Sequence, residues 1–90
     1  MAPAAHRRFS QFISSLKERI RTEAKTLADD PYRWEELKGP LKGLRSCKFS
    51  FKGTRYRIAY RINATEHVIE IALVGPRQNF YEMLRRIIQR

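Results

Sequence analysis

The sequence predicts an α+β domain in which an N-terminal helical pair and a C-terminal helix pack on a small antiparallel sheet. Three observations support this prediction. Apolar residues recur at helical spacing in the first third of the chain, at a period of two in the middle, and at helical spacing again near the end. Glycines and prolines gather where the period changes. A chain of 90 residues has room for one modest core, so we expect residues 1–90 to form a single domain.

The N-terminal third has the pattern of two amphipathic helices, or of one long bent helix. Ser14 and Ser15 are candidate caps for a second helix that starts near Leu16. The sequence DDP then ends the helical pattern at Pro31. The apolar positions at helical spacing are Phe9, Phe12, Ile13, Leu16, Ile20, Ala24 and Leu27.

The next stretch, DDPYRWEELKGPLKG, contains two prolines and two glycines and predicts a loop, with room for a short helical turn. We expect Tyr32, Trp34 and Leu37 to hold this loop to the core. After Gly43, three segments alternate at a period of two, and turns at KGT and NATEH separate them. They predict a three-stranded antiparallel meander, which GP ends before the helical pattern of RQNFYEMLRRIIQR begins.

The strand alternation divides the sheet into two faces, and we expect the helices to cover the apolar one. That face is predicted to carry Cys47, Phe49, Phe51, Tyr56, Ile58, Tyr60, Ile62, Ile69, Ile71 and Leu73. The open face is predicted to carry Lys48, Lys52, Arg55, Arg57 and Arg61 around Ala59 and Ala72. A shallow floor of small residues with cationic walls suits a phosphate backbone. The alternative is a solvated face whose charges keep strand edges from pairing.

Composition narrows the class of partner. The chain carries 19 Lys and Arg against 9 Asp and Glu, and the formal net charge of +10 favours nucleic acid or an acidic protein as the partner.

The only cysteine is Cys47, and no cysteines or histidines have metal-site spacing, so we expect a cytoplasmic protein without a metal or cofactor. No apolar run approaches the roughly 20 residues of a membrane span.

Several motifs occur in a characteristic order: a helical pair, LKGPLKGLRSCKFSF, YRIAYRI, an isoleucine-rich strand ending VGPR, and FYE. In this order and spacing the chain resembles the RelE/ParE superfamily of type II toxins, from about Phe9 to Tyr81 and into the last helix. Members of this superfamily usually begin with a β-strand before the helical pair. MAPAAHRR has little strand character. Either this fourth strand is absent, or the natural reading frame begins upstream of Met1.

For RelE-type members, the resemblance implies a toxin that cleaves mRNA in the ribosomal A site without a metal, and that an acidic, RelB-like antitoxin silences. The family's catalytic positions fall on Arg57 in the YRIAY strand, Arg77 at the strand end, and Tyr81. Lys48 occupies the basic position on the preceding strand. A second basic residue often follows two positions later, where this chain has Ser50. Lys52 or Arg55 could supply that charge from the turn.

RNA cleavage through the 2′-hydroxyl needs a proton acceptor, cationic donors for the phosphorane, and a proton for the leaving oxygen. We expect Arg57 and Arg77 to hold the phosphate, Lys48 to act as the base, and Tyr81 to orient the ribose or stack on a base. His6 and His67 lie near a terminus and in a turn, so neither is assigned as the base. The residues expected to bind RNA around this group are Arg45, Lys52, Arg55 and Arg61.

Two alternatives remain at this stage. The first is a ParE-like toxin that poisons DNA gyrase, which would have the same fold and cleave no RNA. The second is a non-enzymatic protein that binds RNA or ribosomes, a function that the positive net charge would support equally well. An adjacent acidic open reading frame would favour either toxin.

Overall fold

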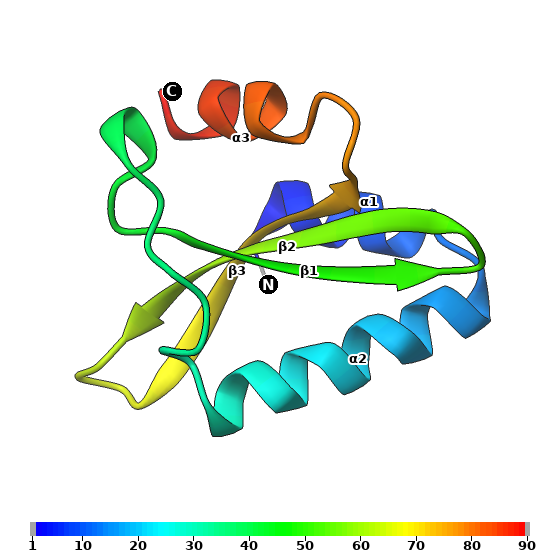
Figure 1. Ribbon diagram of the computed structural model, residues 1–90, viewed down its shortest axis with the longest axis horizontal. Helices are drawn as coiled ribbons and strands as arrows, with labels where there is room; N and C mark the ends of the chain where they lie inside the picture. The colour runs from blue at the N-terminus through cyan, green and yellow to red at the C-terminus, as the bar shows by residue number, and fades with distance from the viewer. Residues whose placement is uncertain (1, 90) are drawn as a thin grey trace.

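The computed structural model describes residues 2–89 and confirms the α+β class (Figure 1). Its three strands form one antiparallel sheet in which strands that follow one another in the chain lie side by side, as the meander predicts. The elements in chain order are α1 (Pro3–Ser10), α2 (Ser14–Asp29), a 3-10 turn (Gly39–Leu41), β1 (Arg45–Phe51), β2 (Thr54–Asn63), β3 (Val68–Pro76) and α3 (Phe80–Ile88).

The N-terminal segment forms two helices, not one bent helix. Helix α2 begins at Ser14, its N-cap is Ile13, and no side chain caps it. The expected role of Ser14 and Ser15 as caps is therefore wrong, because both residues lie inside the first turn of the helix. No helix within residues 2–89 is long and apolar enough to cross a membrane.

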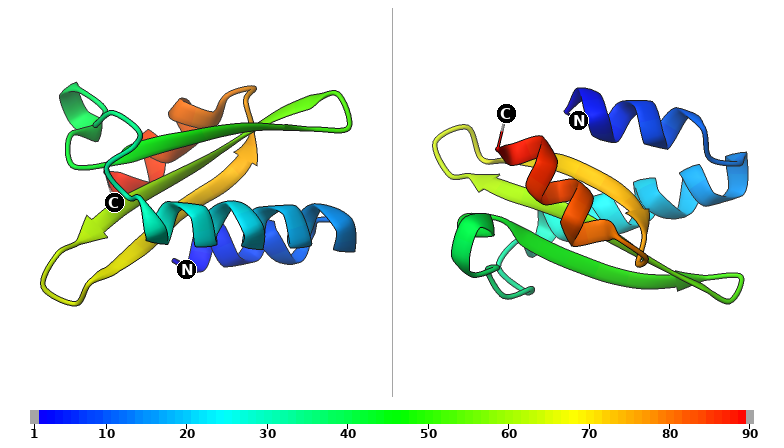
Figure 2. Two further views of the ribbon diagram at one scale, coloured as in Figure 1. Left: turned by 60° about the horizontal axis from the view of Figure 1, so that its bottom comes forward. Right: turned by 90° about the horizontal axis from the view of Figure 1, so that it is seen from above.

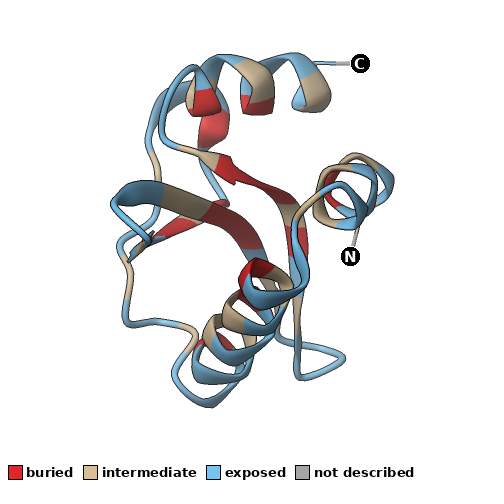
Figure 3. Ribbon diagram, turned by 90° about the vertical axis from the view of Figure 1, so that its right-hand side faces the viewer, coloured by how far each residue is buried: buried red, intermediate tan, exposed pale blue. Residues whose placement is uncertain are grey.

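The helices lie on both faces of the sheet. Helices α1 and α2 cover one face, whereas α3 lies across the other (Figures 2 and 3). Phe80 and Leu84 of α3 are fully buried against Ala59 and Leu73. The expectation that all helices share one face is wrong. The second face also contains apolar residues, and the amphipathic α3 shields them from water.

A β-bulge places Ile71 and Leu73 of β3 on opposite faces of the sheet. Ala59 pairs with Leu73 and Tyr60 pairs with Ile71, which leaves Ala72 as the extra residue. The extra residue turns Leu73 toward α3, while Ile71 stays with the helical pair. The expectation that Ile71 and Leu73 lie on the same face of the sheet is therefore wrong, because the alternation is shifted by one residue after Ala72.

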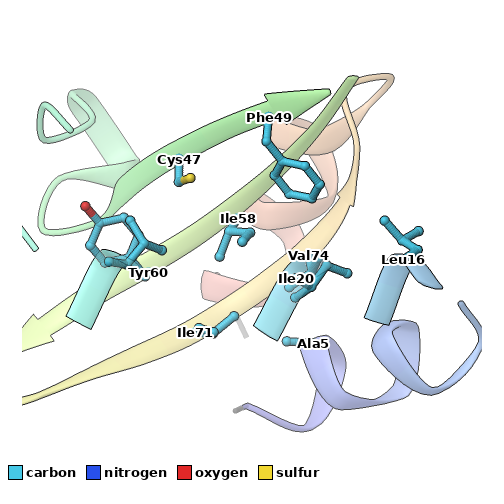
Figure 4. Close-up of a cluster of buried hydrophobic side chains, with 10 residues drawn as sticks. Ala5, Leu16, Ile20, Cys47, Phe49, Ile58, Tyr60, Ile71 and Val74 are labelled. Carbon is cyan, nitrogen blue, oxygen red and sulfur yellow. The ribbon is translucent and has the colours of Figure 1, made fainter. Parts of the chain in front are cut away.

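The main core lies between the sheet and the helical pair, with side chains from α1, α2 and all three strands (Figure 4). Tyr60 is fully buried there, and its hydroxyl donates a hydrogen bond of 2.7 Å to the carbonyl oxygen of Pro31, which ties the loop to the sheet. Trp34 and Leu37 are partly buried, as expected. Tyr32 is 63% exposed, so its predicted role as a core anchor is wrong.

The start of the chain lies along the outer edge of β3. The backbone N–H of Ala2 donates to the carbonyl oxygen of Ile71 at 2.9 Å. Within residues 2–89 the sheet has three strands and no N-terminal fourth strand. On the other edge, the backbone N–H of Leu37 donates to the carbonyl oxygen of Leu44, which draws the long loop against the start of β1.

The thiol of Cys47 is 1% exposed and faces the main core, as predicted. Burial, assisted by the negative charge of Glu23, raises the pKa of this thiol from 9.0 to about 11. Because the fold favours the neutral thiol, its contribution to stability is complete below pH 9.0 and is lost as pH rises toward 11.

We therefore expect native Cys47 to react far more slowly with a thiol reagent at about pH 8 than the same chain in urea does. We also expect the free energy of unfolding to fall between pH 9.0 and about 11, and to fall less in Cys47→Ala. Rapid labelling of the native protein would contradict the buried position of the thiol.

Candidate functional site

The centre of the site is a pair of like charges on neighbouring strands. Lys48 of β1 lies directly opposite Arg57 of β2, and Ser50 lies opposite Arg55. Cross-strand partners share a face, and like charges directly opposite one another destabilise a sheet. An anion bound between Lys48 and Arg57 would remove this repulsion. The strand register thus creates a local preference for a negatively charged ligand.

Helix α3 adds a tyrosine to this pair. Arg57 Nη1 donates a hydrogen bond of 2.7 Å to the hydroxyl oxygen of Tyr81, and the guanidinium lies 4.9 Å from the centre of the Tyr81 ring. The Tyr81 hydroxyl in turn donates to Ser46 Oγ at 3.4 Å. Arg57 Nε is buried and has no hydrogen-bond partner within residues 2–89. The hydrogen bond to Tyr81 therefore holds the guanidinium in place, while its buried Nε–H is left without a partner in this part of the chain.

Arg77 joins the site through the backbone. Its N–H donates to the carbonyl oxygen of Arg55 at 2.9 Å, which continues the pairing of β2 and β3 one step beyond Pro76. The exposed Arg77 and Arg55 both line an open hollow of about 680 Å³. Lys52 lies at the tip of the adjacent hairpin, in a two-residue turn with Gly53 in which both residues have positive φ.

Two of the predicted RNA-binding residues lie away from this group. Arg45 faces the helical-pair side, where its Nη1 donates to the carbonyl oxygen of Trp34 at 2.6 Å and its guanidinium lies 5.1 Å from the Tyr32 ring. Arg61 lies toward the far end of β2 and forms an ion pair of 3.3 Å with Glu70, the residue opposite it in β3. The structure thus brings Lys48, Arg57 and Tyr81 together, and does not bring Arg45 or Arg61 to them.

A cavity of about 340 Å³ adjoins the site and contains residues that the sequence did not identify. It shares Lys48 and Tyr81 with the cationic group. Strand alternation alone could have identified Ser46, because it lies two residues before Lys48 on the same face. The local sequence pattern does not predict that residues 33–37, in the loop before β1, line this cavity. The residues lining the cavity are Arg33, Trp34, Glu35, Glu36, Leu37, Ser46, Lys48 and Tyr81.

The geometry suits an oxyanion bound by the positioned Arg57 guanidinium and the opposite Lys48 beside the phenol of Tyr81. Across residues 2–89, no three His, Cys, Asp or Glu side chains come close enough together to hold a metal ion. The side chains that the structure brings together at the site are Lys48, Arg57, Ser46 and Tyr81.

Comparison with known proteins places the chain in a family. No curated protein matches its sequence. The crystal structure of the isolated E. coli RelE toxin is similar, with a TM-score of 0.62 and 20% identity over 92% of this chain and 89% of that chain, a likeness that shows the shared fold. The model of a family described as the ParE-like toxin of type II bacterial toxin-antitoxin systems matches residues 1–85. The RelE/ParE resemblance is thus confirmed, and the chain belongs to this family of ParE-like type II toxins.

Proposed function

We propose that this toxin is a metal-independent endoribonuclease that cleaves mRNA in the ribosomal A site and so inhibits translation. The observation that best supports this proposal is the Lys48–Arg57 pair, with Tyr81 hydrogen-bonded to Arg57 on the same face. RNA cleavage by an attacking 2′-hydroxyl needs fixed cationic donors beside a group that can position a ribose. This group of residues meets both needs.

Each residue is proposed for one role. Arg57 donates to the phosphate oxygens as negative charge grows on them, and Arg77, beside Arg55, holds the phosphate backbone next to the cleaved bond. Tyr81, fixed between Arg57 and Ser46, orients the ribose or stacks on a base. Lys48 lies opposite Arg57 and shares a cavity with Tyr81, and we propose that it takes the proton of the 2′-hydroxyl.

The biological setting follows from the family. A type II toxin has a cognate antitoxin. We propose that this antitoxin is acidic and RelB-like, that residues 1–90 act as one toxin domain, and that the substrate is mRNA on cytoplasmic ribosomes. The net charge of +10 supports both the acidic partner and the ribosomal one.

A second candidate function is that of a ParE-like toxin that poisons DNA gyrase, which the family description favours. Inducing the toxin in bacteria and mapping mRNA ends alongside chromosome integrity separates the two. We expect cuts at fixed codon positions in translated messages, with the chromosome intact. We expect Arg77→Ala to weaken the cuts and Arg61→Ala, whose ion pair with Glu70 lies apart from the site, to preserve them. Growth arrest with intact mRNA and double-strand DNA breaks would instead support gyrase poisoning.

A further inference from the structure

We propose that Arg55 binds the phosphate at which the RNA is cut, as a second arginine beside Arg57. The small side chain of Ser50 leaves the room that this phosphate needs. The proposal rests on the proposed endoribonuclease function and adds a residue to its reacting centre. It assigns the charge that the uncharged Ser50 does not supply to Arg55, and not to Lys52.

The strand register places Arg55 and Arg57 on the same face of the sheet. Ser50 of β1 lies opposite Arg55, two residues along each strand from the pair that contains Arg57. The pair between them is Phe49 and Tyr56, whose side chains pack with the main core and whose rings stack at 5.5 Å between centroids. Because side chains alternate along a strand, the residues on either side of this aromatic pair point to the other face, on which α3 lies.

A hollow of about 240 Å³ lies among these residues. All the residues that line it belong to β1 and β2, and none belongs to the helical pair, so it opens on the face of the sheet opposite the main core. The exposed serine on one strand leaves space beside the exposed arginine on the other, which a longer side chain on the serine strand would fill. The residues that line the hollow are Lys48, Phe49, Ser50, Arg55, Tyr56 and Arg57.

The two arginines of this hollow have no acidic partner. None of the four ion pairs found within residues 2–89 includes Arg55 or Arg57, and no Asp or Glu lines the hollow. Positive charges two residues apart on one strand face repel each other, and an anion bound between them removes the repulsion. The planar guanidinium of the exposed Arg55 can also donate to two phosphate oxygens at once. Both features favour a phosphate in this position.

The proposed reaction needs a second fixed cation at the phosphate. As the 2′-oxygen bonds to phosphorus, its proton passes to Lys48 and the charge on the phosphate oxygens grows from one negative charge toward two. The bond from phosphorus to the 5′-oxygen then breaks, and that oxygen takes up a proton from solvent. A lysine accepts a proton only when it is uncharged, so Lys48 as the base does not also balance the phosphate. Arg57 and Arg55 together supply two positive charges for the two negative ones.

Lys52 and Arg77 lie outside this hollow. The Nζ of Lys52 is 5.4 Å from the centre of the Phe51 ring, which packs against the main core on the opposite face, and Lys52 lines neither neighbouring hollow. Arg77 lines the larger hollow of about 680 Å³, which it shares with Arg55. Arg55 therefore lies between the two hollows. An RNA with its reacting phosphate at Arg57 would have its next phosphate near Arg77.

The first test measures the single-turnover cleavage rate of full-length variants on ribosomes programmed with a defined codon. We expect Arg55→Ala to lower this rate about tenfold or more, a smaller loss than for Arg57→Ala because solvent screens the exposed Arg55. Lys52→Ala removes the same charge from the tip of the hairpin and should lower the rate less. Arg61→Ala is the control, since Arg61 is an exposed arginine of the same strand that pairs with Glu70.

A swap across the strand pair tests the position of the charge. Ser50→Arg combined with Arg55→Ser keeps the net charge and moves the guanidinium to the facing residue, with the small serine now on β2. We expect this double variant to recover most of the rate that Arg55→Ser alone loses. Ser50→Leu leaves Arg55 in place but fills the hollow, so it should lower the rate. Thermal unfolding of each variant checks that the fold is retained.

A binding measurement separates this site from the cleavage activity. A 2′-O-methyl trinucleotide, whose attacking hydroxyl is blocked, is titrated into the full-length toxin at several salt concentrations while NMR follows the backbone amides of Lys48 and Ser50. We expect both amide signals to shift. In Arg55→Ala, we expect the slope of log affinity against log salt concentration to become shallower by about 0.7, as for one lost phosphate contact on a single strand. Arg61→Ala should leave the slope unchanged.

An Arg55→Ala rate within a few-fold of the unmodified toxin would overturn the proposal. So would equal losses in Lys52→Ala and Arg55→Ala, because the charge of the whole hairpin would then matter and not its position at the hollow. No recovery in the swapped variant, or an unchanged salt slope in Arg55→Ala, would overturn it too. A toxin that binds the trinucleotide through Arg55 but leaves cellular mRNA intact would refute the endoribonuclease function and leave the phosphate site standing.

Discussion

Replacing Arg57 with alanine is expected to lower the rate of mRNA cleavage by about 100-fold or more, as for loss of a fixed transition-state donor. Arg57 combines three properties that no other residue of the site has. It lies opposite Lys48, it holds Tyr81 through a hydrogen bond of 2.7 Å, and its Nε has no partner within residues 2–89. The measurement is the single-turnover cleavage rate on ribosomes programmed with a defined codon.

The stability of this variant should change little, because removing a buried N–H without a partner offsets part of the packing that is lost. Arg57→Lys keeps the charge but lacks the planar fork that contacts Tyr81 and a phosphate together, so we expect an intermediate rate. Arg61→Ala is the matched control on the same strand, since Arg61 is exposed and paired with Glu70. An Arg57→Ala rate within a few-fold of the unmodified toxin would refute the catalytic role.

The sequence alone predicted correctly which basic residues of β1 and β2 share a face of the sheet. Alternation along β1 and β2 put Lys48 and Arg57 on one face, and the two-residue turn at Lys52 and Gly53 then brought them into direct opposition. These features depend on residues that are close in the chain. The same reasoning identified Cys47 and Tyr60 as core residues, and both are buried.

The errors arose where distant segments meet. The amphipathic pattern of α3 shows that the helix has an apolar side, but not which sheet face that side covers. One extra residue at Ala72 moved Leu73 to the other face, and a period-two pattern does not reveal a bulge. Arg45 could not be recognised as a loop anchor, because its contact is the carbonyl oxygen of Trp34, eleven residues earlier.

The position of Tyr81 depends on how α3 docks, and Phe80→Ala is expected to disturb that docking strongly. Phe80 is fully buried on the face with Ala59 and Leu73, and its ring contacts Tyr81 edge to face at 5.6 Å between centroids. Removing a buried phenylalanine side chain costs about 3–5 kcal/mol, a large share of the free energy of unfolding of a small domain. We expect a lower unfolding midpoint in urea and a loss of cleavage, because Tyr81 leaves Arg57.

Hydrogen exchange at individual amides distinguishes local undocking of α3 from unfolding of the whole domain. The α3 cluster is separate from the larger core of α1, α2 and the sheet, so α3 can detach while that core remains. We expect hydrogen exchange in Phe80→Ala to speed up at the amide of Met83, which donates to the carbonyl oxygen of Asn79, the N-cap of α3. We expect exchange to stay slow at Ile58 in the centre of β2. Ile88→Ala, on the same helix but 40% exposed, should leave both amides and the cleavage rate nearly unchanged. Equal acceleration at Met83 and Ile58 would mean that the two clusters unfold together, and that α3 is an integral part of one cooperative core.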